Sequence, residues 1–192
     1  MKIKNVRCCE RPEWRFTFFV KEKNMLERFY PNEYVNSVED IDFDMYYKQG
    51  IRGVIFDIDN TLVPHGHPAT DKSIEFFEKL RKIGLDTCLI SNNQEPRVEP
   101  FAYAVKSKYI FDAHKPSTRN YKKAMELMNT DVDSTIFVGD QIFTDVYGAN
   151  RTGIQSVMVK KIDKKEEIQI VLKRIPEKFI LWRWKKKMSG SA

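Results

Sequence analysis

After residue 50, the pattern of hydrophobic and polar positions along this chain alternates between the one typical of buried strands and the one typical of helices. Five short runs rich in branched aliphatic and aromatic residues have the length of buried strands, at 52–57, 86–91, 109–112, 134–139 and 155–159. Between these runs apolar residues recur every three or four positions, as on one face of an α-helix. Strands that alternate with helices predict right-handed crossovers and a parallel sheet covered on both faces. We therefore expect a doubly wound α/β fold of three layers with a five-stranded parallel sheet.

Local signals set the limits of the predicted helices. Thr70 or Asp71 can cap the first of them, and Gly84 can end it in a left-handed conformation. The following helices are expected to begin near Pro96, at Ser117 or Thr118, and at residue 142, the last ending at Gly153. In such a fold the ligand site lies at the carboxyl ends of the strands.

Length and composition are typical of a globular protein with one core. The 192 residues are 42% hydrophobic and 31% charged. The three cysteines Cys8, Cys9 and Cys88 show no CxxC spacing, which favours a reducing compartment. The chain has no apolar run long enough to span a bilayer and no hydrophobic signal core at its start. We therefore expect a cytoplasmic protein with a basic extension at 1–24, which we leave unassigned, a catalytic domain at 25–160 and a basic amphipathic segment at 161–192.

The net charge of +6 is concentrated at the two ends of the chain. Residues 160–187 hold 11 Lys and Arg against 4 Asp and Glu, residues 1–23 hold 7 against 3, and the region between them is acidic. A nucleic-acid partner is not expected, because a protein that binds nucleic acid would be basic over its whole binding face. Basic ends around an acidic middle favour a catalytic domain that settles as a peripheral protein on an anionic membrane surface.

The carboxyl-terminal segment has two interpretations. Ile168, Val171, Leu172 and Ile175 form a helical stripe that is typical of packing on the domain. Beyond Pro176 the residues 179–187 place Trp and aliphatic side chains among cations, a composition typical of a lipid interface. The tail therefore either packs on the domain with a solvated lysine end or lies on a membrane.

Polar residues follow four of the predicted strands directly. The groups are Asp57-Ile-Asp59-Asn-Thr61, Ser91-Asn92-Asn93, His114-Lys115-Pro116-Ser117 and Gly139-Asp140 with Asp145. Because parallel strands end at one edge of the sheet, these side chains are expected to share one crevice. Carboxylates crowded together repel unless a hard cation lies between them, so the sequence predicts Mg²⁺ bound through oxygen ligands.

A phosphoryl transfer uses this combination of residues. Asp57 can attack phosphorus to form an aspartyl phosphate, and Asp59, two residues later, can protonate the leaving alcohol and then deprotonate the attacking water. Lys115 and Ser91 can hold the phosphoryl oxygens. Thr61 and Asn92 are assigned to the same phosphate site.

These four groups resemble, in order and spacing, the four motifs of the haloacid dehalogenase (HAD) superfamily. The resemblance implies that Asp57 is the nucleophile and a metal ligand, that Asp59 is the acid/base and binds metal through its carbonyl, and that Asp140 and Asp145 hold the metal. Asp at position 59 is the residue that the phosphatases of the superfamily carry, whereas its dehalogenases and P-type ATPases do not.

Residues 25–184 resemble the YqeG-type branch of these phosphatases more closely. The residues that carry this likeness include Asp57-Ile-Asp-Asn-Thr-Leu-Val-Pro64 and Gly139-Asp-Gln-Ile-Phe-Thr-Asp-Val146. The branch is similar to the mitochondrial and plastid phosphatidylglycerophosphate phosphatases, which implies a phosphorylated lipid substrate. The spaces between the motifs leave no room for a sizeable cap domain, so the site is expected to be open to a large substrate.

Other functions and roles stay open at this point. The substrate can instead be a phosphoprotein, a nucleic-acid end or a soluble metabolite, and a receiver-like regulator also uses Asp, Lys and Thr around Mg²⁺. Asp145 can be an ordinary carboxylate in the first turn of a helix, and Ser91 can cap the helix that follows it. His65, His67 and His114 lie near these groups, but there is no Cys/His pair at ligand spacing and the Asp-rich setting prefers a hard metal, which argues against zinc.

Overall fold

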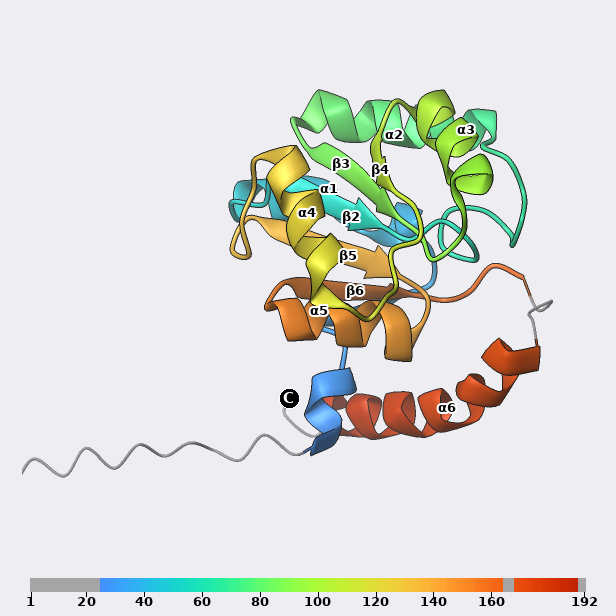
Figure 1. The fold of residues 1–192 in the computed structure, drawn as a ribbon. Coiled ribbons are helices and arrows are strands. Elements are labelled where there is room, and N and C mark those ends of the chain that lie inside the picture. Colours follow the sequence, from blue (N-terminus) through green and yellow to red (C-terminus); the bar gives the residue numbers. More distant parts are fainter. Residues whose placement is uncertain (1–24, 164–167, 190–192) are drawn as a thin grey trace, which may run out of the picture.

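The computed structural model describes residues 25–163 and 168–189, and within these ranges it is a three-layer α/β fold (Figure 1). Six parallel strands form one sheet in the order β1-β6-β5-β2-β3-β4. The strands are β1 (Glu33–Val35), β2 (Gly53–Phe56), β3 (Asp86–Ile90), β4 (Lys108–Ile110), β5 (Thr135–Gly139) and β6 (Gln155–Val159). The predicted fold class is confirmed.

The helices follow the strands along the chain as the apolar periodicity indicates. They are α1 (Phe43–Lys48), α2 (Asp71–Ile83), α3 (Glu95–Val105), α4 (Thr118–Met128), α5 (Tyr147–Thr152) and α6 (Ile168–Ser189). Short 3₁₀ turns lie at η1 (Met25–Phe29) and η2 (Val38–Asp40), and a π-helical turn, η3 (Ile142–Val146), leads into α5. The helix predicted from residue 142 is therefore wider in its first turn than an α-helix.

The predicted number of strands was wrong by one. β1 pairs in parallel with β6 at the edge of the sheet, where Glu33 lies opposite Val157. It has three half-buried residues, flanked by Asn32 and Asn36. This strand comes before the regular alternation of strands and helices that begins after residue 50, which is why the sequence predicted five strands.

The predicted limits of α2 are confirmed by its capping contacts. The Thr70 hydroxyl accepts a hydrogen bond from the backbone N–H of Ser73 at 3.2 Å. Gly84 ends the helix with φ of 97°, a left-handed conformation that costs glycine little. Between these ends, Phe77 and Leu80 point into the core. The caps thus set the length over which the apolar face of α2 covers the sheet.

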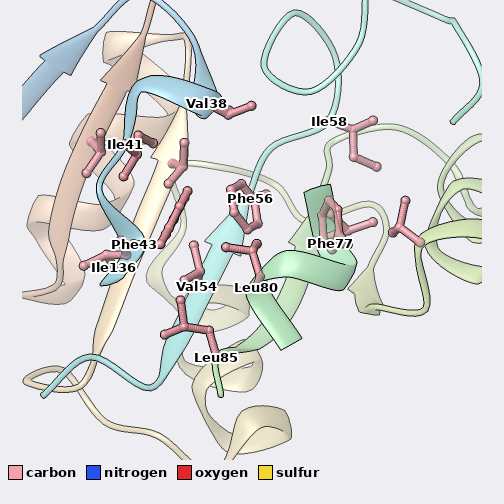
Figure 2. Close-up of a cluster of buried hydrophobic side chains, with 14 of the residues drawn as sticks. Val38, Ile41, Phe43, Val54, Phe56, Ile58, Phe77, Leu80, Leu85 and Ile136 are labelled. Carbon is pink, nitrogen blue, oxygen red and sulfur yellow. The ribbon is translucent and has the colours of Figure 1, made fainter. Parts of the chain in front are cut away.

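Strand β2 divides its side chains between two cores. In β2, Val54 and Phe56 join the cluster under α1, α2 and α3, whereas Ile55 faces α4 and α5. Figure 2 shows the first cluster, in which Phe56 lies among Phe43, Phe77 and Leu80. Because every strand residue of β2 is buried, the sheet is covered on both faces, as a parallel sheet requires.

The register of the central strands brings their polar ends together. Phe56 of β2 lies opposite Leu89 of β3 and Val138 of β5. Asp57, Ser91 and Asp140 therefore leave three neighbouring strands at nearly the same level. The loops that follow β2 and β3 lead directly into α2 and α3, so neither of these described loops carries an inserted domain.

The C-terminal helix α6 has one packed face and one open face. Ile180 is buried against Ile142, Val146 and Met158 of the domain. The helix runs through Pro176 rather than changing there. Near the end of α6, the Lys187 Nζ lies 2.6 Å from the Glu27 carboxylate of η1. The end of α6 and η1 lie side by side in Figure 1. Within the described ranges, no helix is both long enough and apolar enough to cross a bilayer.

Some of the sequence predictions fall outside these ranges. The basic extension at 1–24 lies beyond the described residues, and so do Cys8 and Cys9. The side chains of Ile168 and Val171, two members of the predicted stripe, are also outside the description. Cys88, which is described, is a free and buried thiol in β3. Burial raises the pKa of that thiol to about 12, so it is a core residue.

Candidate active site

Three carboxylates meet at the carboxyl edge of the sheet. Asp57 follows β2, Asp140 follows β5, and Asp145 lies in η3, and each offers an oxygen within 4.8 Å of the others. Asp140 and Asp145 are fully buried and Asp57 is 6% exposed. Carboxylates packed this closely away from water repel one another unless cations lie among them. Their hard oxygen donors fit a divalent ion such as Mg²⁺, and these three residues would hold it.

Lys115 is the cation that contacts two of these carboxylates. Its Nζ lies 2.5 Å from Asp57 Oδ1 and 2.7 Å from Asp145 Oδ1. Burial works to lower the pKa of Lys115, but the charges of Asp145 and Asp57 outweigh it and hold that pKa above its usual value. The lysine therefore carries a positive charge over the whole physiological range of pH.

The pKa of Asp57 is raised to about 7. Burial is the main cause, and Asp145 and Asp59 add to it, whereas the ammonium of Lys115 works to lower the pKa. The pKa of Asp140 is also raised well above its ordinary value, by burial and against the opposing charge of Arg174. A further cation in the site would stabilise the deprotonated form of both carboxylates. That is the form in which a carboxylate binds metal.

Asn92 positions Lys115 through the backbone. Its Oδ1 accepts a hydrogen bond from the Lys115 N–H at 2.7 Å, and its Nδ2 donates to the Lys115 carbonyl at 3.4 Å. The amide thus ties the loop after β4 to the end of β3. This contact orients Lys115, and direct binding of phosphate by Asn92 stays a prediction.

Ser91 and Thr61 lie inside the same crevice, and both are 2% exposed. The Ser91 Oγ accepts the N–H of Asn93 at 3.1 Å, which leaves its own hydroxyl hydrogen available to an incoming oxygen. The Thr61 Oγ1 lies 3.4 Å from Asp57 Oδ2 and 3.5 Å from Asp140 Oδ1. Thr61 therefore bridges the carboxylates that follow β2 and β5.

The side chain of Asp59 lies outside the cluster of three carboxylates. Its Oδ1 accepts hydrogen bonds from Arg97 Nη2 at 2.9 Å and from the Gly66 N–H at 2.8 Å, and its Oδ2 accepts one from Asn93 Nδ2 at 2.7 Å. Three donors hold this carboxylate beside the cluster and fix its direction. Metal binding by Asp59 was predicted through its carbonyl oxygen and stays a prediction.

Two arginines at this site were not predicted. Arg97 of α3 holds Asp59, and Arg174 of α6 forms an ion pair with Asp140. Arg97 lies on the helix after the Ser91 group, four residues past Asn93, so its helical position offered a weak signal. Arg174 lies in a run of basic residues far along the chain from Asp140, and nothing in the local pattern distinguishes it from its neighbours.

Comparison with known proteins shows which family has sequences similar to this chain. Residues 112–169 match the family model described as HAD-hydrolase-like. The protein named "Probable phosphatase YqeG" from Bacillus subtilis (strain 168) is 32% identical over 165 residues, which cover 85% of this chain and 96% of that protein. Phosphatidylglycerophosphate phosphatase 1, chloroplastic/mitochondrial, from Arabidopsis thaliana is 26% identical over 170 residues, 82% of this chain but 48% of that protein. A crystal structure 13% identical in sequence aligns with a TM-score of 0.52, covering 70% of this chain and 85% of its own, which supports a shared fold.

Proposed function

The chain belongs to the HAD-like hydrolases, in the branch that includes YqeG, and on that premise we propose that it is a Mg²⁺-dependent phosphomonoesterase with Asp57 as its nucleophile. The observation that carries this proposal is the buried contact of Asp57 with Lys115 beside two further carboxylates. A buried carboxylate at the end of a central strand, next to a fixed ammonium, is placed to meet an anionic phosphorus centre.

The reaction proceeds in two displacements. A carboxylate oxygen of Asp57 forms a bond to phosphorus while the bond to the leaving oxygen breaks, and Asp59 gives that oxygen its proton. Water then attacks the phosphorus, Asp59 takes the proton from the water, and phosphate leaves with the restoration of Asp57. When bound by Asp57, Asp140 and Asp145, Mg²⁺ supplies the positive charge that offsets repulsion between carboxylates and phosphate.

The remaining side chains orient these groups. Lys115 and the Ser91 hydroxyl hold the phosphoryl oxygens as their charge grows. Arg97 and Asn93 keep the Asp59 carboxylate facing in one direction, which matters because proton transfer needs hydrogen-bond distance to the leaving oxygen. The backbone contacts of Asn92 keep Lys115 in place.

The substrate class that we propose is a phosphorylated lipid, with phosphatidylglycerophosphate as the specific candidate. The described loops after β2 and β3 carry no cap domain, so a phosphate presented by a large body can reach the site. The Arabidopsis relative is named for that lipid, although the chain spans about half of its length. Binding of such a substrate at a surface requires the protein to lie against a membrane.

The open face of α6 supports such a surface contact. Leu172, Ile175, Phe179 and Trp182 follow a helical stripe and are 65%, 69%, 52% and 56% exposed. Phe179 and Trp182 stack with their ring centroids 6.0 Å apart, and Lys186 lies over the Trp182 ring. Aromatic and aliphatic side chains among lysines match the interface of an anionic bilayer. We propose that this outer stripe of α6 holds the protein at the cytoplasmic face of the membrane as a peripheral protein.

A panel of substrates tests the proposed activity. With Mg²⁺, phosphate release from phosphatidylglycerophosphate in mixed micelles is expected to exceed release from glycerol phosphate, nucleotides and a phosphopeptide by at least about tenfold in kcat/KM, or roughly 1.4 kcal/mol of transition-state binding. Removal of the ion with a chelator should stop the reaction.

A soluble monoester, a phosphopeptide or a nucleic-acid end that turns over faster than the lipid would refute the lipid substrate but keep the phosphatase. No hydrolysis of any member of the panel, with Mg²⁺ present and the protein folded, would refute the enzyme itself and favour a phosphate-binding regulator.

Vesicle sedimentation tests the membrane contact. The wild type is expected to sediment with phosphatidylglycerol vesicles at low salt and to be released as salt shortens the Debye length to about 3 Å at 1 M. Changing Phe179→Ser with Trp182→Ser should lower the partition coefficient by at least about tenfold, because each aromatic side chain contributes roughly 1.5–3 kcal/mol when buried.

The matched control is Tyr103→Ser, which removes an aromatic residue that is 71% exposed on α3. It should sediment as the wild type does. Equal sedimentation of the double variant and the wild type would show that the outer stripe of α6 is not the membrane contact.

A further inference from the structure

Arg174 makes the contact by which α6 reaches the candidate metal site. Its Nη1 donates to the Asp140 carbonyl at 2.8 Å, and its Nη2 donates to Asp140 Oδ2. Asp140 is fully buried, and the Arg174 side chain is 13% exposed. Two donors of one planar guanidinium therefore fix both the backbone and the side chain of the residue that follows β5.

A second residue of α6 holds the other end of the same segment. The Glu177 Oε2 lies 2.9 Å from Arg174 Nη1, and its Oε1 accepts the N–H of Ile142 at 2.8 Å. Glu177 is itself 3% exposed. Arg174 and Glu177, one helical turn apart, thus clamp the chain from Asp140 to Ile142, where β5 passes into η3.

The two oxygens of the Asp140 carboxylate have different surroundings. Oδ2 is bonded to Arg174, whereas Oδ1 lies 3.5 Å from the Thr61 hydroxyl, which also contacts Asp57. The arginine thereby occupies the oxygen on the side of α6. The remaining oxygen, Oδ1, lies beside the Thr61 hydroxyl that also contacts Asp57.

We propose that Arg174 is a positioning residue of the metal site, which fixes one oxygen of Asp140 so that the other oxygen faces the divalent ion. The proposal rests on the divalent ion of the proposed function and goes beyond it, because it makes the C-terminal helix a part of the active site. Carboxylate ligands held by outer hydrogen bonds are aligned before the ion arrives, which strengthens binding. The same helix carries the outer stripe on its opposite face.

Binding of Mg²⁺ to the full chain, measured by isothermal titration calorimetry without substrate, tests this role. Arg174→Met keeps an unbranched apolar side chain and removes the guanidinium with both donors. The dissociation constant of Mg²⁺ is expected to rise by about tenfold to a hundredfold, the range for loss of a hydrogen-bond partner of a metal ligand. Arg174→Lys, which keeps the charge without the planar fork, should show a smaller rise.

Arg183→Met is the matched control, because it removes an exposed arginine from the same helix. Its dissociation constant should equal that of the wild type, and circular dichroism should show each variant folded. If Arg174→Met does not fold, Arg174→Lys decides: equal affinities of Arg174→Lys and Arg183→Met would refute the proposal.

Tighter binding of Mg²⁺ by Arg174→Met would also refute it, since that result would show that the arginine competes with the ion for Asp140. A wild type that binds neither Mg²⁺ nor Mn²⁺ would refute both this role and the proposed function. A wild type that binds Mg²⁺ but hydrolyses no substrate would contradict the proposed function alone.

Discussion

Asp57→Asn is expected to abolish hydrolysis, with kcat falling by at least about 10⁴-fold, as expected for loss of a catalytic nucleophile. Asparagine has nearly the same size as aspartate but its neutral amide cannot form the aspartyl phosphate. The measurement is phosphate release in the presence of saturating Mg²⁺, with trapping of the covalent phosphate by acid quench in the wild type.

The variant should stay folded, which separates loss of chemistry from loss of structure. Burial raises the pKa of Asp57 to about 7 in the folded chain without metal, above its ordinary value of 3.8. The folded state therefore binds the proton more tightly than the unfolded state, and the ionised carboxylate costs stability that grows as the pH rises from about 4 to 7. Asparagine removes this cost, so Asp57→Asn should be at least as stable as the metal-free wild type at pH 8.

Asp133→Asn is the control for the same chemical change at an exposed loop position. Its activity and its urea midpoint should match those of the wild type. Retention of about one per cent or more of the wild-type rate by Asp57→Asn would show that another group attacks phosphorus.

The sheet and the place of the site could be predicted because they depend on local patterns. A run such as 53–56 is buried on both faces and therefore continuously apolar, so it is visible as a strand without any knowledge of its neighbours. Parallel strands end at one edge, which is enough to bring Asp57, Lys115 and Asp140 together. The structure confirms that these three side chains lie at the same edge of the sheet, whereas their chemical roles stay predictions.

The contacts around the site could not be predicted in the same way. Arg174 reaches Asp140 because α6 packs back on Ile142 and Met158, an arrangement set by tertiary packing and not by any local period. Asp59 is held by Arg97, whose direction depends on how α3 leaves the loop after β3. The sequence likewise left two interpretations of the tail, and the structure shows that its helix has one packed face and one open face.

Lys115→Met is expected to have the second large effect, on the stability of the folded chain. Its ammonium lies between Asp57 and Asp145, and removal of one partner from a buried ion pair leaves an uncompensated charge. The free energy of unfolding without metal should fall by about 3–5 kcal/mol at pH 8. Urea denaturation followed by circular dichroism measures this loss, and hydrolysis should be lost with it.

The dependence of this loss on pH and on Mg²⁺ identifies its cause. The pKa of Lys115 is raised, so the lysine of the wild type stays charged from pH 5 to 9. In the variant the pKa of Asp57 rises further, because the charge that lowered it is gone. The deficit should therefore shrink as the pH falls toward 7, because Asp57 of the variant takes up its proton at a higher pH than Asp57 of the wild type does, and Mg²⁺ should restore part of the stability at pH 8. Lys122→Met, an exposed change on α4, should cause no such loss. A deficit that is independent of both pH and Mg²⁺ would mean that Lys115 stabilises the fold by packing alone, and the electrostatic account of the site would fail.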